Sequence, residues 1–276
     1  MSGYRLTRTG TWALTAAAAV LYLVFCWLFA DGLLAGAGEP VEWYSSPVLT
    51  WLLFLAIVAA GAWQARNLPA DGLALALPHD GLTPGQTDDP RWWRLLTGNV
   101  HWSLMWLPFR FFVGRDWFSH GMDKVTNPAW MDGSGKALAG YWTNAVKIPE
   151  EGRPPITYDW FRNFLQYMLD QNWAPWFSKV IVYGEMLVGL GILVGALVGL
   201  AAFFGTVLNL NFGLAGTAST NPILFGLSVL LVLGWRVAGW WGLDRLLLPL
   251  FGIRPNPDTA GRVIAAAETA LAGRRE

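Results

Sequence analysis

The segment MWLPFRFFVGRDWFSHGMDKVTNPAWM, residues 105–131, joins an apolar stretch typical of a membrane-spanning helix to an unusual set of ionisable side chains. These side chains are Arg110, Arg115, Asp116, His120, Asp123 and Lys124. We predict one helix over about residues 101–121, whose charged end reaches a membrane surface. Because a charge within hydrocarbon costs a few kcal/mol, such side chains must face a bundle interior, a partner or water.

A helical projection divides the polar residues of this segment into two sectors. At about 100° per residue, one stripe contains Arg110, Gly114, Trp117, Gly121 and Lys124. The second sector contains Asp116, His120 and Asp123. Glycines within the first stripe would let a neighbouring helix approach the charged residues closely. Asp123 and Lys124 are predicted to lie near the surface.

The composition of the whole chain indicates an integral membrane protein. Of its 276 residues, 54% are hydrophobic and only 14% are charged, whereas about a quarter are charged in soluble proteins. The 18 tryptophans cluster near segment ends, as is typical of membrane interfaces. The net charge is zero, so no electrostatic field attracts nucleic acid, and no nucleic-acid partner is expected.

Six segments approach the roughly 20 apolar residues that a spanning helix needs. They are 11–30, 47–65, 101–121, two spans within 176–217, and 222–241. Arginines precede the first span, follow the second and follow the last, which predicts that these regions share the cytoplasmic side. We therefore expect a multi-pass protein of a prokaryotic plasma membrane, with both termini in the cytoplasm.

The predicted spans define the domain organisation. Residues 1–66 form an N-terminal helix pair, and residues 67–100 form a cytoplasmic linker rich in Pro and Asp. Residues 101–250 form a four-helix bundle that includes a non-cytoplasmic, aromatic insert at 123–175. The fold class is therefore all-α, with an amphipathic helix around residues 160–168 of the insert. The tail 251–276 is predicted to be helical and cytoplasmic.

Arg110 is the central residue of the candidate site, because a guanidinium in a membrane helix requires an anion or other acceptors. Glu185 is the only acidic residue deep within another predicted span, so an Arg110–Glu185 ion pair is predicted. Such a pair could simply lock two helices together. Alternatively, Arg110 or Lys124 binds an anion or a quinone carbonyl while Glu185 or His120 handles a proton. His120 could also be an ordinary interfacial histidine.

Further polar and small residues occur within the later spans. Asn209 and Asn211 are expected either to bond between helices or to form a pocket wall. Gly184, Gly191 and Gly195 share one helix face, which predicts close helix packing. Asp244 is expected to pair with Arg245 or to cap a helix.

Several kinds of site lack their sequence patterns. The single cysteine, Cys26, excludes an internal disulfide and a CxxC pair. The GSGK at 133–136 lacks both the earlier glycine and the following Ser or Thr of a phosphate-binding loop. The three histidines have no metal-ligand spacing, so no metal, haem or flavin is predicted for this chain.

The region from about residue 101 to 250 resembles the DoxX/DoxD family of prokaryotic membrane proteins. The matching pieces are FRFFVGRDWFSHGMDKVTNPAW at 109–130, YGEMLVGLGILVG at 183–195, NLNFG at 209–213 and GWWGLD at 239–244. The resemblance implies a four-helix membrane bundle, to which this chain adds an N-terminal helix pair. One branch of the family includes a subunit of thiosulfate:quinone oxidoreductase.

The resemblance implies that thiosulfate is oxidised on the non-cytoplasmic side and that quinone in the bilayer receives the electrons. The predicted catalytic residues are Glu185, Arg110 and His120. The predicted quinone-binding residues are Lys124, Trp117, Asp123, Trp130, Asn209 and Asn211. As an alternative, the chain is a non-catalytic accessory subunit that binds membrane or periplasmic subunits through insert 123–175. A small transporter or lipid-binding protein is a third reading, although no inverted repeat supports it.

Overall fold

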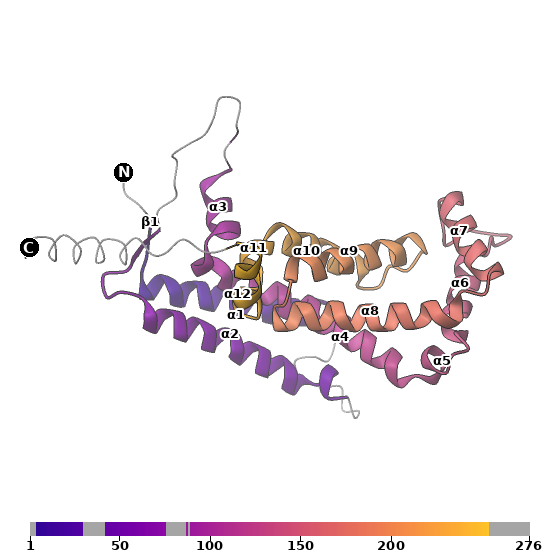
Figure 1. Cartoon of the computed structure of the whole chain (residues 1–276), viewed down its shortest axis with the longest axis horizontal. Coiled ribbons are helices and arrows are strands. Elements are labelled where there is room, and N and C mark those ends of the chain that lie inside the picture. Colours follow the sequence, from indigo (N-terminus) through magenta and orange to yellow (C-terminus); the bar gives the residue numbers. More distant parts are fainter. Residues whose placement is uncertain (1–3, 30–41, 76–86, 88, 254–276) are drawn as a thin grey trace, which may run out of the picture.

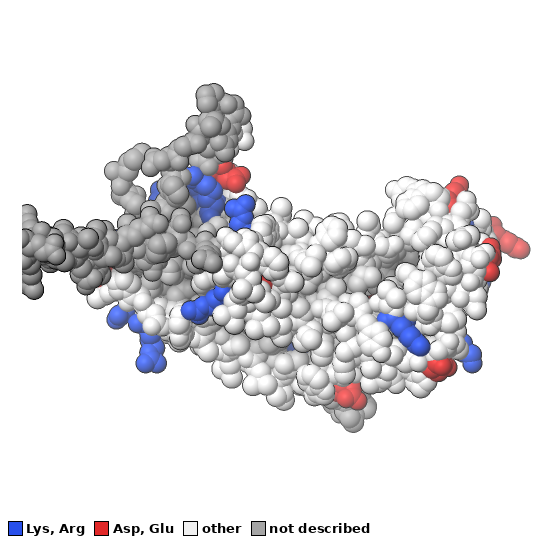
Figure 2. Space-filling model, viewed as in Figure 1, with Lys and Arg blue, Asp and Glu red and all other residues white. Residues whose placement is uncertain are grey.

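The computed structural model describes residues 4–29, 42–75, 87 and 89–253, which are mostly helical. Among these residues, three helices are long and apolar enough to cross a membrane: α1 (Arg8–Phe29), α2 (Pro47–Asn67) and α8 (Ala174–Val194). The elongated arrangement of the helices is visible in Figure 1. On the face shown in Figure 2, charged side chains gather toward the two ends, and the band between them is almost free of charge. The described residues are thus mostly helical, as the predicted all-α class requires, and three of their helices have the length and composition of membrane spans. The predicted helix at the C-terminus falls mainly in residues 254–276, outside the described part.

The N-terminal helices α1 and α2 form a closely packed pair. Gly61 of α2 lies so near α1 that a Cβ atom there would be 2.0 Å from Thr15 Oγ1. Ser46 caps α2 by accepting a hydrogen bond from the Leu49 amide at 3.4 Å, and Pro47 occupies the first helical position, where no amide is needed. Strands β1 (Tyr4–Leu6) and β2 (Leu73–Leu75) pair antiparallel beyond the other ends of these helices. The predicted linker 67–100 therefore contains regular structure, which also includes α3 (Arg91–Gly98).

The charged segment forms two elements rather than one helix. A 3₁₀ helix, η2 (Val100–Trp106), leads into α4 (Leu107–Thr126), so the predicted helix at 101–121 starts later and ends later than expected. Glycines set the distance between α4 and α8: a Cβ at Gly121 would lie 2.6 Å from Met186 Cγ, and one at Gly189 would lie 2.3 Å from the Phe118 nitrogen. The predicted close approach at the glycines of α4 is confirmed.

The predicted packing face on α8 is wrong at Gly184. No atom lies within 4 Å of a Cβ atom built at Gly184, so this glycine faces open space. Gly195 ends α8 in the left-handed conformation with φ of 72°, which favours glycine. Gly189, rather than Gly184, makes the close contact with α4.

The last two predicted spans form shorter helices than expected. They are α9 (Val198–Leu214) and α10 (Asn221–Leu233), with 17 and 13 residues. The predicted span 222–241 breaks at Gly234, where a Cβ would lie 2.5 Å from the Trp106 ring. The short helices α11 (Trp235–Ala238) and α12 (Asp244–Leu247) and the 3₁₀ helix η3 (Leu248–Phe251) follow.

The insert has a hydrophobic core of its own. Helices α5 (Pro128–Met131), α6 (Lys136–Val146) and α7 (Asp159–Asp170) lie at one end of the molecule, beyond α8 and α9 (Figure 1). The core contains Leu138 and Trp142 of α6 with Phe161 and Leu165 of α7. The amphipathic helix predicted around residues 160–168 is confirmed, since Phe161, Leu165 and Met168 are buried.

A single larger core connects the N-terminal pair to the other helices. It contains buried side chains of α1, α2, α4, α8, α9 and α10, among them Tyr22, Ile57, Phe112, Ile192, Ala202 and Leu231. The side chains of α1 and α4 meet in ring contacts, such as Phe25 with Phe109 at 5.5 Å. The N-terminal pair is therefore packed into the same body as α4, and it helps to hold the charged helix in place.

Candidate functional site

Lys124 of α4 and Glu185 of α8 form an ion pair near the insert. The Lys124 ammonium lies 2.5 Å from Glu185 Oε2. Only 1% of the Glu185 side chain is exposed, against 18% for Lys124. The lysine also lies over the Trp130 ring, 5.4 Å from its centroid, where the face of the indole attracts a cation. The expectation that Lys124 lies at the surface is therefore wrong, because α4 continues to Thr126 and carries Lys124 against α8.

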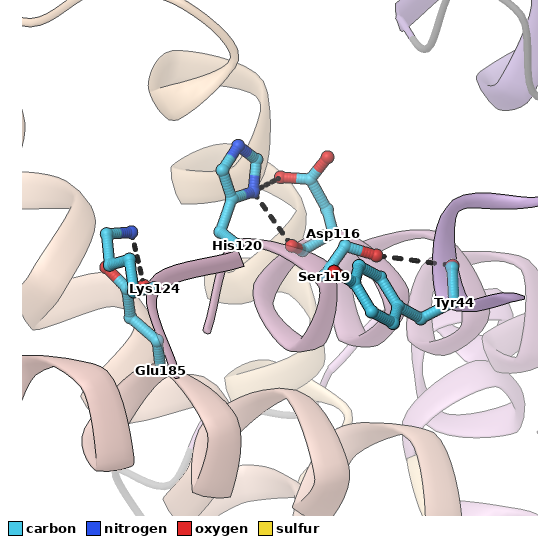
Figure 3. A network of polar contacts seen from close by, with 6 residues as sticks. All are labelled: Tyr44, Asp116, Ser119, His120, Lys124 and Glu185. Carbon is cyan, nitrogen blue, oxygen red and sulfur yellow. Dashed lines mark hydrogen bonds and ion pairs between the residues drawn. The ribbon is translucent and has the colours of Figure 1, made fainter. Parts of the chain in front are cut away.

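His120 contacts Asp116 one turn earlier on α4 (Figure 3). Its Nδ1 lies 2.8 Å from the Asp116 carbonyl oxygen and 3.3 Å from Asp116 Oδ2. Both oxygens are acceptors, so Nδ1 carries the proton and Nε2 remains for another partner. His120 is about half exposed, which lets this second nitrogen exchange protons with a ligand or with water.

These two pairs stand beside a cavity of about 220 Å³, which we call the polar pocket. The pocket is enclosed by α4, α5, α6, α8, α9 and the start of α10. Its lining residues are Trp117, His120, Lys124, Trp130, Tyr141, Glu185, Phe212, Thr217, Ser219, Thr220, Asn221 and Leu224. The predicted residues Trp117, His120, Lys124, Trp130 and Glu185 are thus brought together in one place. Charged groups lie on the α4 and α8 walls, and aromatic rings supply much of the rest.

The predicted Arg110–Glu185 pair is wrong. Arg110 is fully buried, and its guanidinium donates hydrogen bonds to the carbonyls of Ile192, Leu193, Ala238 and Trp241, at 3.0, 2.9, 3.2 and 3.4 Å. The first two carbonyls lie in the last turn of α8, where the helix dipole presents partial negative charge. Carbonyls at helix ends have no partner within their helix. Arg110 therefore joins α4 to the end of α8 and to the turn after α11, away from the polar pocket.

Arg115 is a second buried arginine whose role the sequence did not indicate. It donates hydrogen bonds to the carbonyls of Tyr44 at 3.0 Å and Ser46 at 2.6 Å, and to the hydroxyl of Thr50. It therefore fixes α4 to the start of α2. A signal did exist, because Arg115 lies about 140° from Arg110 around the helix and must face a different neighbour.

Asp123 lies outside the polar pocket and faces the N-terminal pair. The Tyr44 hydroxyl donates a hydrogen bond to Asp123 Oδ1 at 2.8 Å. Ser119 donates to the Tyr44 carbonyl at 3.3 Å (Figure 3). Burial, together with this bond to a carboxylate, raises the pKa of Tyr44 to about 12. Asp123 thus has a structural contact in place of the predicted contact with quinone.

The two asparagines of α9 have different surroundings. Asn211 is exposed and donates to the Val207 carbonyl of its own helix at 2.7 Å. Asn209 is buried, and neither of its amide atoms has a hydrogen-bond partner among the described residues. The Trp117 indole nitrogen likewise has none there, and it lies against α9 at Gly205, one turn from Asn209. A buried polar group without a partner is costly. Trp117 lines the polar pocket, whereas Asn209 lines neither that pocket nor the other described cavity, so the predicted contact of Asn209 with quinone is not seen.

Asp244 caps a helix, which confirms one of its two predicted roles. Its carboxylate accepts hydrogen bonds from the amides of Leu197 at 2.5 Å and Val198 at 3.0 Å, at the start of α9. Arg245 lies over the rings of Trp63 and Trp240, with centroid distances of 5.5 and 5.6 Å. These contacts hold the end of the molecule that lies opposite the insert.

The chemistry available to the polar pocket follows from its side chains. An ammonium can donate to a carbonyl or an anion, and a carboxylate and an imidazole can exchange protons. Tyr141 contributes a phenol whose pKa is raised by burial, so it stays protonated as a donor. Within the described part of the chain, no group of three or more His, Cys, Asp or Glu residues is placed to hold a metal ion. No family model, curated protein or solved structure matches the chain.

Proposed function

We propose that the protein is a quinone-binding membrane protein of DoxX/DoxD type, which couples oxidation of a small donor to the quinone pool. The observation that carries this proposal is the polar pocket, where Lys124, Glu185 and His120 line a cavity with aromatic walls. In this proposal the chain crosses a prokaryotic plasma membrane six times, with α9 and α10 as its short spans. Both termini lie in the cytoplasm, and the insert lies on the opposite side.

The side chains of the pocket suit the ring of a quinone. The Lys124 ammonium has three donor hydrogens, and the bond to Glu185 uses one of them. Another can donate to a quinone carbonyl while Trp130 and Phe212 pack against the ring faces. Reduction of a quinone consumes two protons and two electrons. In this proposal Glu185 and His120, which both line the pocket, pass two protons from water to the quinone.

The electron donor in this proposal is thiosulfate, and it rests on the resemblance of the sequence to the DoxD branch. Two thiosulfate ions form one sulfur–sulfur bond to give tetrathionate and release two electrons. Those electrons, with two protons from water, convert one quinone to one quinol. The reaction needs no thiol from the protein, which agrees with a chain whose only cysteine, Cys26, is buried.

A binding measurement with a tail-less 1,4-benzoquinone tests the pocket. The purified protein in mild detergent should bind this probe with saturation. Lys124→Met and Glu185→Gln should each weaken binding at least tenfold, which corresponds to about 1.4 kcal/mol. Lys179→Met is the matched control, because Lys179 lies on α8 as an exposed lysine outside the pocket.

The same variants separate the redox role from a purely structural one. If binding is equal in the wild type, Lys124→Met and Lys179→Met, the pocket does not hold a quinone. Thiosulfate-dependent reduction of quinone in native membranes then tests the donor. Reduction that depends on the protein but remains unchanged in Lys124→Met would place the chemistry in another subunit.

A second candidate function is that of an accessory subunit, and the surface of the insert favours it. Tyr158, Trp160, Phe164 and Tyr167 are exposed around α7, and aromatic residues are enriched where proteins associate. Trp160→Glu combined with Tyr167→Glu should release partner subunits from the complex in native membranes. Release without loss of quinone binding would establish the insert as the interface and keep the polar pocket as a separate site.

A further inference from the structure

A second cavity, which we call the apolar groove, lies next to the polar pocket. Its volume is about 430 Å³, and it runs between α8 and α9 beneath the helices α6 and α7 of the insert. Leu187, Phe204 and Val207 line it and are themselves partly exposed on the flank of the molecule. The groove therefore opens sideways onto the apolar surface, in contrast to the charged mouth of the polar pocket.

The groove and the pocket share two lining residues. Tyr141 and Phe212 line both cavities, and their rings meet edge to face with centroids 6.1 Å apart. The Tyr141 hydroxyl is 2.7 Å from Thr217 Oγ1, which lines the pocket. The two cavities therefore adjoin each other at these two rings, where the insert meets the end of α9.

We propose that the apolar groove holds the hydrocarbon tail of a single-tailed membrane amphiphile whose head group lies in the polar pocket. The two cavities together match such a molecule, with charged and hydroxyl groups at one end and aliphatic and aromatic side chains at the other. The ligand enters sideways from the bilayer between α8 and α9. Only the identity of the head group as a quinone rests on the proposed function.

Gly184 supports the groove as a place for a ligand. It lines the groove, and a Cβ atom built there meets nothing within 4 Å. A glycine in the middle of a helix costs about 0.5–1 kcal/mol relative to alanine. Helix packing usually explains such a residue, yet here no helix approaches it. The missing side chain instead leaves the groove wider at Gly184.

The test is native mass spectrometry of the protein purified from its own membranes in mild detergent, with bound small molecules identified. Gly184→Trp and Val207→Trp narrow the groove from the α8 wall and the α9 wall. Loss of the ligand in both variants shows that a folding defect in one of them is not the cause. Gly226→Trp on α10 is the matched control, because Gly226 also meets nothing within 4 Å but lies outside the groove. We expect a long-tailed molecule on the wild type and the control, and a loss of at least tenfold in both groove variants.

The tail-less 1,4-benzoquinone separates this inference from the proposed function. If both hold, the groove variants lose the long-tailed quinone but still bind the tail-less ring. A retained single-chain lipid that the groove variants lose would support the groove and contradict the quinone, whereas a retained phospholipid with two acyl chains would contradict the single-tailed ligand. Equal retention of the long-tailed molecule in the wild type and both groove variants, or no such molecule on the wild type, would overturn the proposal.

Discussion

The Lys124 ammonium lies 2.5 Å from Glu185 Oε2 across the contact between α4 and α8, and the lysine is the only member of the pair with appreciable exposure. Glu185 Oε1 has no hydrogen-bond partner among the described residues. Because burial of a charge is costly, the carboxylate depends on the lysine more than the lysine depends on the carboxylate.

This asymmetry gives the first prediction. Breaking a buried ion pair costs about 3–5 kcal/mol, and Lys124→Met should approach that cost because Glu185 loses its counter-charge. Glu185→Leu should cost less, since the Lys124 side chain can reach water. The combination of both changes should recover most of the stability. A double-mutant cycle of unfolding free energies in detergent measures this, and additive single effects would show that the two residues do not couple.

The second prediction concerns Arg110, whose contacts are structural. Arg110→Lys should lower the unfolding free energy by about 3 kcal/mol or more, because an ammonium cannot reach all four carbonyls and hydrogen bonds from charged groups contribute about 1.5–3 kcal/mol each. Thermal unfolding measures the loss. Arg236→Lys, at an exposed arginine of α11, should change little.

Folded Arg110→Lys protein should still bind the tail-less quinone with wild-type affinity, because Arg110 does not line the polar pocket. A selective loss of quinone affinity without a loss of stability would restore the functional role that the sequence suggested for this residue.

The third prediction compares two glycines of the same helix. Gly184→Ala should raise the unfolding free energy by up to about 1 kcal/mol, since its Cβ meets no atom and alanine favours the helix. Gly189→Ala should lower it by about 1–3 kcal/mol through overpacking against the Phe118 backbone. Melting temperatures of the two variants should therefore move in opposite directions. Equal shifts would contradict the difference in packing around the two glycines.

The fourth prediction is a loss of stability in alkali. The pKa of Tyr44 is raised to about 12, above the value near 10 of an unfolded tyrosine, so the folded protein retains this proton longer than the unfolded chain does. Its contribution is complete below about pH 10 and is lost as the pH rises toward 12. Melting curves between pH 9 and 12 should fall less steeply for Tyr44→Phe than for the wild type. Tyr158→Phe, at an exposed tyrosine, should behave like the wild type.

The sequence predicted those helices whose ends are determined by neighbouring residues. The ends of α1 and α2 follow from hydropathy and from the cap at Ser46. The early end of α10 does not, because it depends on the packing of Gly234 against Trp106, a residue far away in the chain. The pairing of Tyr4–Leu6 with Leu73–Leu75 was also missed, because the two strands are far apart in the chain and each has only three residues.

The error at Arg110 has a physical cause. Arg110 and Lys124 lie on the same stripe of α4, but they are separated by 14 residues, or about 21 Å along the helix. The choice of partner for Glu185 depends on how far α8 is shifted along α4. That shift is set by the contacts of Gly114, Gly121 and Gly189 with the opposite helix, and the sequence contains no direct signal for it. The sequence therefore predicted Arg110 as the partner of Glu185, and the packing of the two helices gave Lys124 instead.

The unequal lengths of α8, α9 and α10 have a consequence for the lipid around the protein. Their 21, 17 and 13 residues correspond to about 31, 25 and 20 Å, against a hydrocarbon core of about 30 Å. If α9 and α10 cross the membrane as proposed, a bilayer that matches α8 must become thinner along them to avoid hydrophobic mismatch. The apolar groove lies between α8 and α9, where this change in thickness would begin. In that arrangement the lipid chains next to the groove are the most deformed, and a tail that moves from the bilayer into the groove leaves the least favourable packing.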